Sequence, residues 1–343
     1  MQGFVELNER SDRMVPVRGR RYLAGSDSEQ VPLAVPMANE RLLSLRAEQR
    51  LQTPQEAAAA CRPLIDARLA ETGALRLSGL PLRERADFDA FMAALGYAPH
   101  SYAGGIAVRA RESGMALVAS QEDARITMAP HNEMAYLPDV PAKVFFFCEQ
   151  AAPHGGEVPI NDIRDSVRHI PDEVLSEFAE RGIRYHRHLP RESTPTQVGW
   201  METYGVPDAA ALDALMQAQG LEHRWATRQA VMISQLRPAF RADPDGGAPL
   251  WFNQVTELHS SYWRNHPLFP SDAPEHSYPA TTSYGDGEPI DPQLITSLRA
   301  ALWQTASAVR MAPGDVLVLD NLHIQHGRFA YEGPRRHLVS ITA

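Results

Sequence analysis

The stretch that decides the fold lies near the C-terminus, where residues 316–328 read VLVLDNLHIQHGR. Residues 316–319 are a short apolar run of the β-rich type, and they predict a buried strand. Polar residues follow the run at once, and the segment ends in the tripeptide His326-Gly327-Arg328. A buried strand at this place predicts that the end of the chain contributes to a β-rich core.

Similar runs recur along the chain and define its class. Short β-rich runs bounded by turn residues occur at 74–77, 115–119, 144–148, 183–186, 231–234, 250–252 and 338–342. Helical patterns occur at 53–71, 84–95, 171–181, 207–218 and 291–310, and the first opens on a capping box at Thr53 and stops at Gly73. Many short strands with scattered helices predict an antiparallel barrel or jelly roll with helical padding. A doubly wound sheet would need regular strand–helix alternation and a Gly-rich first turn, and neither is present.

Composition excludes several function classes. The chain has 343 residues, 44% of them hydrophobic, and a formal net charge of −9, with no Lys/Arg run that predicts nucleic-acid binding. No apolar stretch is long enough for a membrane span, and the N-terminus is polar and charged, unlike a signal peptide. The two cysteines, Cys61 and Cys148, lack CxxC spacing and predict free thiols in a reducing compartment. We therefore expect a soluble cytoplasmic protein that binds neither nucleic acid nor membrane.

The sharpest local feature is the segment Pro130-His131-Asn132-Glu133-Met134. In an extended chain, residues i and i+2 point to the same side, so His131 and Glu133 can present an imidazole and a carboxylate to one metal ion. Two histidines and one carboxylate form the facial triad of non-haem Fe(II) oxygenases. The pair alone is a weak signal, because such tripeptides arise by chance, and the third ligand would have to come from a distant strand.

Taken together, these segments make the chain resemble the TauD/TfdA family of 2-oxoglutarate dioxygenases, and within it the branch of SyrP-like hydroxylases. The resemblance covers roughly residues 65–340 and rests on the order and spacing of several pieces. They are residues 73–79, the His131–Glu133 segment, the apolar run from Val144, Gly155-Gly156-Glu157, residues 251–254, Gly314-Asp315, Asp320-Asn321 and His326-Gly327-Arg328.

This resemblance implies a fold of the mainly β class with α-helices. Its core would be a double-stranded β-helix (jelly roll) with flanking helices, in a single domain over 1–343. Residues 1–52 would be an N-terminal extension. Residues 161–225 would be a helical insert between core strands that lies over the mouth of the active site.

The same resemblance implies a metal centre in which His131, Glu133 and His326 hold Fe(II), with 2-oxoglutarate and O2 as cosubstrates. His323 competes for the distal position, but it lies three residues before His326 and would face the other way on a strand. The Asp-Asn…His-Gly-Arg register favours His326, and His323 is predicted to be structural. His186 and His188 could mimic a ligand pair, but they lack a carboxylate partner at the right place.

2-Oxoglutarate also needs a cation for the carboxylate far from the metal, and arginine suits this because its guanidinium pairs with both oxygens. The family places this arginine on the last core strand, which favours Arg336, with Arg335 as the alternate; neighbours on a strand face opposite ways. Arg328 would bind cosubstrate or substrate, or pair with a carboxylate. One residue departs from the family pattern: Val158 stands where a threonine usually helps to bind the same carboxylate.

The implied reaction is hydroxylation or desaturation of an unactivated C–H bond in natural-product biosynthesis. The substrate would be an amino acid or a derivative, free or tethered to a carrier protein, and a homo-oligomer stays open. Two alternatives remain: a Zn or Mn jelly-roll hydrolase or isomerase with the same ligands, and a non-catalytic binding module. Arg109 could hold a substrate carboxylate. Substrate-binding candidates, each equally open to a structural role, are Tyr102, Arg109, Asn132, Tyr136 and Gln254.

Overall fold

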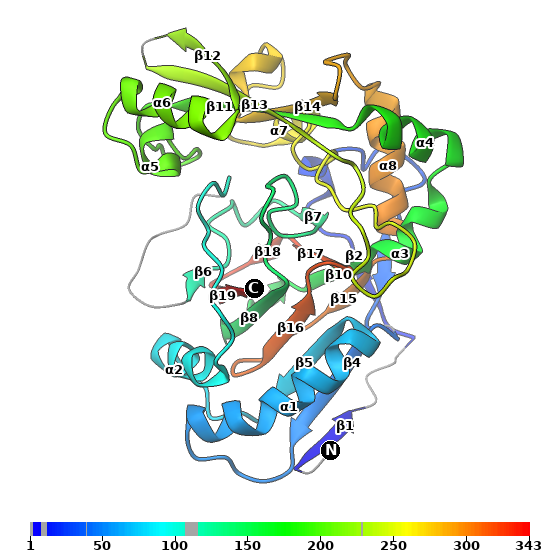
Figure 1. The fold of residues 1–343 in the computed structure, drawn as a ribbon. Helices are drawn as coiled ribbons and strands as arrows, with labels where there is room; N and C mark the ends of the chain where they lie inside the picture. The colour runs from blue at the N-terminus through cyan, green and yellow to red at the C-terminus, as the bar shows by residue number, and fades with distance from the viewer. Residues whose placement is uncertain (1–2, 8–11, 39, 107–115, 228) are drawn as a thin grey trace.

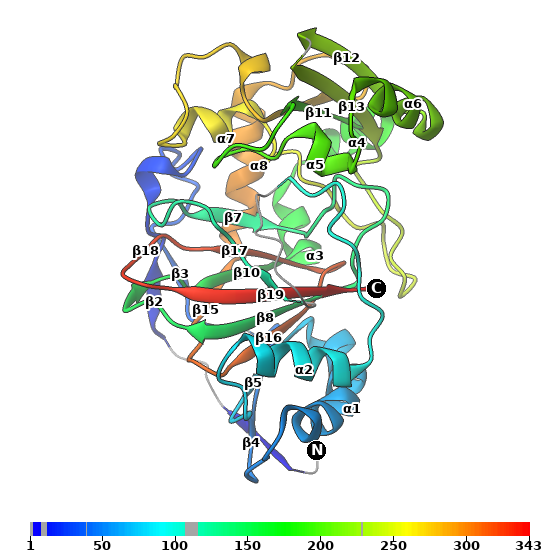
Figure 2. The same ribbon diagram turned by 90° about the vertical axis from the view of Figure 1, so that its left-hand side faces the viewer.

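The computed structural model describes residues 3–7, 12–38, 40–106, 116–227 and 229–343. Its largest sheet runs in the order β1 (Phe4–Leu7), β4 (Leu42–Ala47), β5 (Ala74–Ser78), β16 (Val316–Asp320), β8 (Lys143–Gln150), β19 (Arg336–Thr342) and β6 (Leu117–Val118). A second sheet runs in the order β15 (Ser307–Val309), β10 (Val158–Asp162), β17 (Ile324–Arg328) and β7 (Met128–His131). Apart from the parallel pair β4–β5, the paired strands in both sheets are antiparallel. Figure 2 shows the two sheets stacked as layers, which is the sandwich of a jelly roll.

The strands of the large sheet are buried on both faces. On one face, side chains such as Phe146, Cys148 and Val339 pack across the gap onto Val158 and Ile160 of the second sheet. On the other face, the alternate residues pack on helices α1 (Pro54–Thr72) and α2 (Arg85–Leu95), which cover the bottom of the molecule in Figure 1. This double burial explains why these strands read as nearly continuous apolar runs in the sequence.

A third layer lies above the sandwich (Figures 1 and 2). It is a sheet in the order β12 (Glu222–Thr227), β13 (Ala230–Arg237), β11 (Ile183–Pro190) and β14 (Ala280–Tyr284). Its helices include α5 (Trp200–Tyr204), α6 (Ala209–Gln219) and α7 (Ser260–Asn265), while α4 (Asp172–Arg181), α3 (Ile163–Ser166) and α8 (Pro292–Gln304) run down one side. The segment 161–225, expected as a helical insert, thus also supplies strand β11 and most of β12.

The remaining elements are short. Strand β2 (Met14–Pro16) pairs with β3 (Ala34–Pro36), and β9 (His154–Gly155) pairs with β18 (Tyr331–Glu332). Three 3-10 turns complete the set: η1 (Arg20–Tyr22), η2 (Val167–His169) and η3 (Glu275–Ser277). Within the described residues, no helix is long and apolar enough to cross a membrane.

The mainly β jelly-roll fold is confirmed, as are most of the predicted elements. Helix α1 begins after Thr53, whose hydroxyl accepts a hydrogen bond from the Glu56 N–H at 3.2 Å, and it ends at Gly73 with φ +85°. Both cysteines are buried free thiols, and burial raises the pKa of each to about 12.

Two predicted elements were wrong. Residues 250–252 are not a strand: all three are buried, but Leu250 only forms an isolated bridge to Arg241, because this apolar run packs its side chains without pairing its backbone. The helix predicted to reach residue 310 ends at Gln304, and residues 307–309 instead pair with β10 as strand β15. In both cases the apolar pattern correctly predicted that the residues are buried. It did not predict whether their backbone forms hydrogen bonds with a neighbouring strand.

Candidate metal centre

The segment that follows β7 is held in place by one buried side chain, that of Asn321. Its amide oxygen accepts a hydrogen bond from the Glu133 N–H at 2.7 Å, and its amide nitrogen donates to the carbonyls of Glu133 at 3.1 Å and Pro141 at 2.8 Å. The Asn132 amide donates in turn to the Asn321 carbonyl at 2.6 Å. Because Asn321 lies between β16 and β17, this cluster fixes the backbone of Glu133 beside β17. The Asp320-Asn321 motif therefore positions a candidate ligand.

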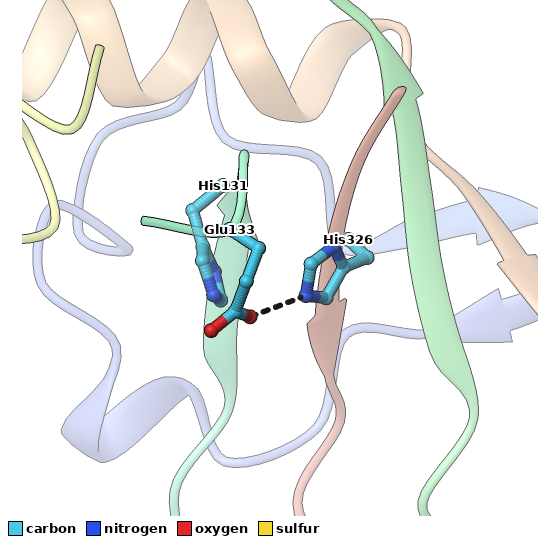
Figure 3. Close-up of side chains that lie close together, drawn as sticks. All are labelled: His131, Glu133 and His326. Atoms are coloured by element: carbon cyan, nitrogen blue, oxygen red, sulfur yellow. Dashed lines mark ion pairs between the residues drawn. The ribbon is translucent and has the colours of Figure 1, made fainter. Parts of the chain in front are cut away.

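Strand β17 brings the third candidate ligand to the same place. His326 pairs in register with His131 across the antiparallel strands, and their ring centroids lie 4.8 Å apart. The His326 Nε2 lies 3.4 Å from a carboxylate oxygen of Glu133 (Figure 3). One ligand atom from each of the three residues lies within 4.8 Å of the others. The structure thus brings together the three side chains that the sequence singled out.

The tautomer and the pKa of His131 suit a divalent metal. The His131 Nδ1 lies 2.9 Å from the Ala129 carbonyl, so it carries the proton and Nε2 offers its lone pair. Burial, and then the neighbouring His326, lower the pKa of His131, which favours the neutral imidazole that a metal requires. Two imidazoles and one carboxylate are the donor set that non-haem Fe(II) sites use. The residues present therefore fit iron.

A small cavity of about 40 Å³ adjoins these three residues, and we call it the inner cavity. Its lining is Ala119, Ser120, Met128, His131, Glu133, Phe146, Val158, His326, Gly327, Arg328 and Arg335. Arg335 is the side chain in it whose charge is least compensated: it donates to the Gly156 carbonyl at 3.2 Å and contacts His337 Nδ1 at 2.9 Å. Within the described residues, no carboxylate lies within 4.0 Å of it, and burial lowers its pKa to about 10. A cation in this state favours an anion as its partner.

Gly156 provides the space for this arginine. It has φ +74°, and a Cβ at this position would lie 2.9 Å from Arg335 Cδ. Position 156 therefore favours glycine for two reasons: its backbone conformation, and the close approach of the Arg335 side chain.

The expectation that Arg336 faces inward was wrong. Its side chain is 46% exposed and pairs with Glu149 on the surface. Val339 and Ile341 of β19 pack in the core between the two sheets, and Arg335, just before the strand, lines the inner cavity. The side chain of Arg335, the alternate candidate, therefore faces the inner cavity.

The two other residues expected near 2-oxoglutarate also line this cavity. Val158 is buried on β10, with no hydroxyl to offer. Arg328 is 3% exposed and donates to the carbonyls of Glu122 at 2.9 Å, Asp123 at 2.6 Å and Ile126 at 3.0 Å. Its guanidinium is thus committed to holding the loop before β7, and this favours a structural role over direct contact with a ligand.

A larger pocket of about 380 Å³ opens beside the metal centre, and we call it the outer pocket. Of the expected substrate residues, Tyr102, Tyr136 and Gln254 line it, together with Pro195 and Thr196 from the segment 161–225. Asn132 does not line it, because its fully buried side chain is used to hold Asn321. Arg109 lies outside the described residues.

Sequence reasoning missed several polar residues of the outer pocket. Glu122 and His266 form a pair at 2.9 Å, and although burial opposes it, the hydrogen bond from His266 lowers the pKa of the Glu122 carboxyl. Glu257 accepts a hydrogen bond from Thr256 Oγ1 at 2.7 Å, and burial raises the pKa of its carboxyl. These residues lie in irregular segments with no motif, so only the Trp251–Gln254 stretch just before Glu257 pointed toward this part of the chain.

A second group of side chains that could hold a metal ion is formed by Asp243, Asp245 and His323. His323 Nδ1 lies 2.8 Å from Asp320, and its Nε2 lies 3.3 Å from Asp243. Both ring nitrogens are therefore used, and the hydrogen bond that His323 donates to Asp320 raises the pKa of His323. This arrangement is an ion-pair clamp, as expected for a structural histidine.

Comparisons with known proteins give the following matches. The family described as "Taurine catabolism dioxygenase TauD, TfdA family" matches residues 37–342. The chain is 30% identical over 288 residues to the dapdiamide synthesis protein DdaC of Enterobacter agglomerans, covering 81% of this chain and 84% of that protein. It is 27% identical over 284 residues to a clavaminate synthase-like protein of Arabidopsis thaliana, covering 81% of this chain and 83% of that protein. The crystal structure of PvcB from Pseudomonas aeruginosa shares the fold, with a TM-score of 0.51, 14% identity and coverage of 98% and 92%.

Proposed function

The chain belongs to the TauD/TfdA family of Fe(II)/2-oxoglutarate-dependent dioxygenases, and from this premise we propose that it oxidises an unactivated C–H bond of an amino acid or an amino-acid derivative. The relative DdaC, which is named for dapdiamide synthesis, supports a biosynthetic role. We further propose that the chain lies near the SyrP-like hydroxylases and that a carrier protein presents its substrate. The product would be an alcohol or an alkene.

We assign the metal ligands to His131, Glu133 and His326, and the anchor of the far 2-oxoglutarate carboxylate to Arg335. The observation that carries this assignment is the shared inner cavity. It places a partly buried guanidinium without a carboxylate partner beside two imidazoles and a carboxylate. A bidentate pair with Arg335 would compensate its charge and fix the orientation of the cosubstrate.

When bound, iron and 2-oxoglutarate would activate O2, which is the oxidant, and 2-oxoglutarate would itself be oxidised to succinate and CO2. The chain's own residues orient the partners and exclude water. Asn321 holds the backbone of Glu133, the Ala129 carbonyl fixes the tautomer of His131, and Arg328 holds the loop before β7. Phe146 and Val158 close the inner cavity with apolar surface, which keeps bulk water from the reacting groups.

Anaerobic titration with Fe(II) and 2-oxoglutarate tests this proposal. The wild type should develop the weak visible charge-transfer band of an Fe(II)–ketoacid complex, and His326→Ala should lack it. His169→Ala serves as the matched control, because His169 is exposed on η2 and lies outside both pockets. A band that survives in His326→Ala would refute the ligand assignment.

Admission of O2 with a panel of amino acids and carrier-bound aminoacyl groups tests the reaction. Succinate release that depends on one member of the panel identifies the substrate class. A Zn or Mn hydrolase or isomerase that used the same ligands would release no succinate.

A further inference from the structure

We propose that the outer pocket recognises a cationic amine on its substrate, and that the Glu257 carboxylate and the Gln254 amide oxygen receive it. The inference deepens the proposed function and rests on it for the identity of the outer pocket as the substrate site. It names the charge of the substrate group that enters, which neither the family nor the relatives fix.

The first argument is the charge of the lining. Glu122, Asp123, Glu133 and Glu257 all line the outer pocket, whereas the described part of that lining holds no lysine or arginine. Glu133 belongs to the metal centre, Glu122 pairs with His266, and Asp123 pairs with Arg125 at 2.6 Å. Glu257 is the acid of this set that is left to a ligand.

The second argument is the state of the Glu257 carboxylate. Its hydrogen bond comes from the neutral Thr256 hydroxyl, and no lysine or arginine of the described residues lies within 4.0 Å of it. Arg299 is the cation behind it, but its guanidinium donates to the Thr256 carbonyl at 2.5 Å and to Ser261 Oγ at 2.9 Å. A partly buried carboxylate that accepts no hydrogen bond from a cation is unfavourable, and burial raises its pKa even though Arg299 attracts it from a distance. A bound ammonium would compensate this charge.

The third argument is a second acceptor on the same turn. The Leu258 N–H donates to the Gln254 carbonyl at 3.2 Å, which closes one helix-like turn and places the side chains of Gln254 and Glu257 on the same side. Gln254 is 5% exposed, and its side-chain oxygen is buried with no hydrogen-bond partner. An ammonium group carries three donors and no acceptor, so it matches both oxygens.

The rest of the pocket suits a cation with an apolar body. Tyr136, Tyr262, Trp263 and Phe269 line it, and the Tyr262 and Trp263 rings meet edge to face with centroids 4.9 Å apart. Aromatic faces attract cations and also contact aliphatic chains. Glu257 is close enough to His131 for their charges to interact, so an ammonium held there would be near the metal centre.

The test is a binding measurement with three probes of one carbon skeleton. L-Leucinamide is a cation below the pKa of its amino group, N-acetyl-L-leucinamide is neutral and N-acetyl-L-leucine is an anion. Their dissociation constants would be measured by calorimetry on anaerobic protein loaded with Fe(II) and 2-oxoglutarate, and again on metal-free protein. We expect the cation to bind roughly 10- to 100-fold more tightly than the neutral probe, the range of a charge-assisted hydrogen bond.

Variants locate the source of this preference. Glu257→Gln should reduce the preference to about twofold or less, and Glu257→Asp should keep part of it. Glu122→Gln is the matched control in the same pocket: the Glu122 carboxylate already has a hydrogen-bond partner in His266 at 2.9 Å, so loss of its charge should leave the preference within about threefold of the wild type.

Each outcome decides the proposal. Tightest binding of the anion, equal binding of the three probes, or no measurable binding would overturn it. Loss of the preference in Glu122→Gln and not in Glu257→Gln would overturn the assignment to Glu257. Weaker iron binding in Glu257→Gln with an unchanged probe preference would show that this acid serves only His131. If the charge-transfer band fails to form but the preference persists in metal-free protein, the proposed function fails and the amine site stands.

Discussion

Two pairs of like residues in and beside strands β17 and β19 differ in their surroundings. His326 of β17 and Arg335, which lies just before β19, line the inner cavity, and Glu133 is the carboxylate among the described residues that pairs with His326. His323, in the turn just before β17, and Arg336, the first residue of β19, lie outside that cavity and pair with Asp320, Asp243 and Glu149. The comparison teaches that the surroundings of a side chain, and not the residue type, separate a candidate ligand-binding group from a structural one.

Replacement of each of the two arginines by leucine, in separate variants, tests this contrast most severely. Arg335→Leu should raise the dissociation constant for 2-oxoglutarate about 100-fold or more, because it removes a bidentate charged pair of roughly 3 kcal/mol. The measurement is the anaerobic titration of the Fe(II)-loaded protein with 2-oxoglutarate. Arg336→Leu is the control: it breaks a half-exposed surface pair and should change the constant less than threefold. The reverse ranking would mean that β19 turns its other face to the cosubstrate.

The sequence could not choose between these arginines for a physical reason. Residues 338–342 are buried on both faces of β19, so the strand has no polar side whose alternation would reveal the register. The metal centre was easier to predict. His131 and Glu133 are two residues apart, and the Asp-Asn…His-Gly-Arg register favours His326 over His323, which lies in the turn before β17.

The outer pocket was the least predictable part of the molecule. Its residues come from separate irregular segments, and Glu257 has no neighbour in the sequence that marks it as a ligand group. Burial of a single acid becomes visible only when the segments are placed in space. The apolar run at 250–252 misled in a related way, because its burial comes from packing in two apolar clusters and not from a sheet.

The ion-pair clamp around His323 should contribute stability with a definite pH dependence. Hydrogen bonding to Asp320 raises the pKa of His323, so its contribution is fully present below the unfolded-state pKa and is lost as pH rises through the folded-state pKa. His323→Gln should therefore lower the free energy of unfolding by about 1 kcal/mol in mildly acidic buffer and by much less in alkaline buffer. Denaturant unfolding at a series of pH values measures this difference.

The same variant also tests whether His323 differs from His326 in its role. Because His323 lies outside the inner cavity, His323→Gln should keep the charge-transfer band with Fe(II) and 2-oxoglutarate. A stability difference that grows with pH would contradict the clamp, and loss of the band in folded protein would assign His323 to the metal centre.

The smallest predicted effect comes from restoring a hydroxyl to the cavity face. Val158 and threonine have nearly the same shape, so Val158→Thr should fold normally and place its hydroxyl among the groups that line the inner cavity with Arg335. One added hydrogen bond to the cosubstrate carboxylate of about 1 kcal/mol would tighten 2-oxoglutarate binding roughly fivefold. Val309→Thr is the matched control, since Val309 pairs with Val158 on β15 and is equally buried but does not line the cavity. It should cost stability without tightening binding. Equal tightening in both variants, or in neither, would show that the carboxylate of 2-oxoglutarate does not reach the β10 side of the cavity and that Arg335 holds it alone.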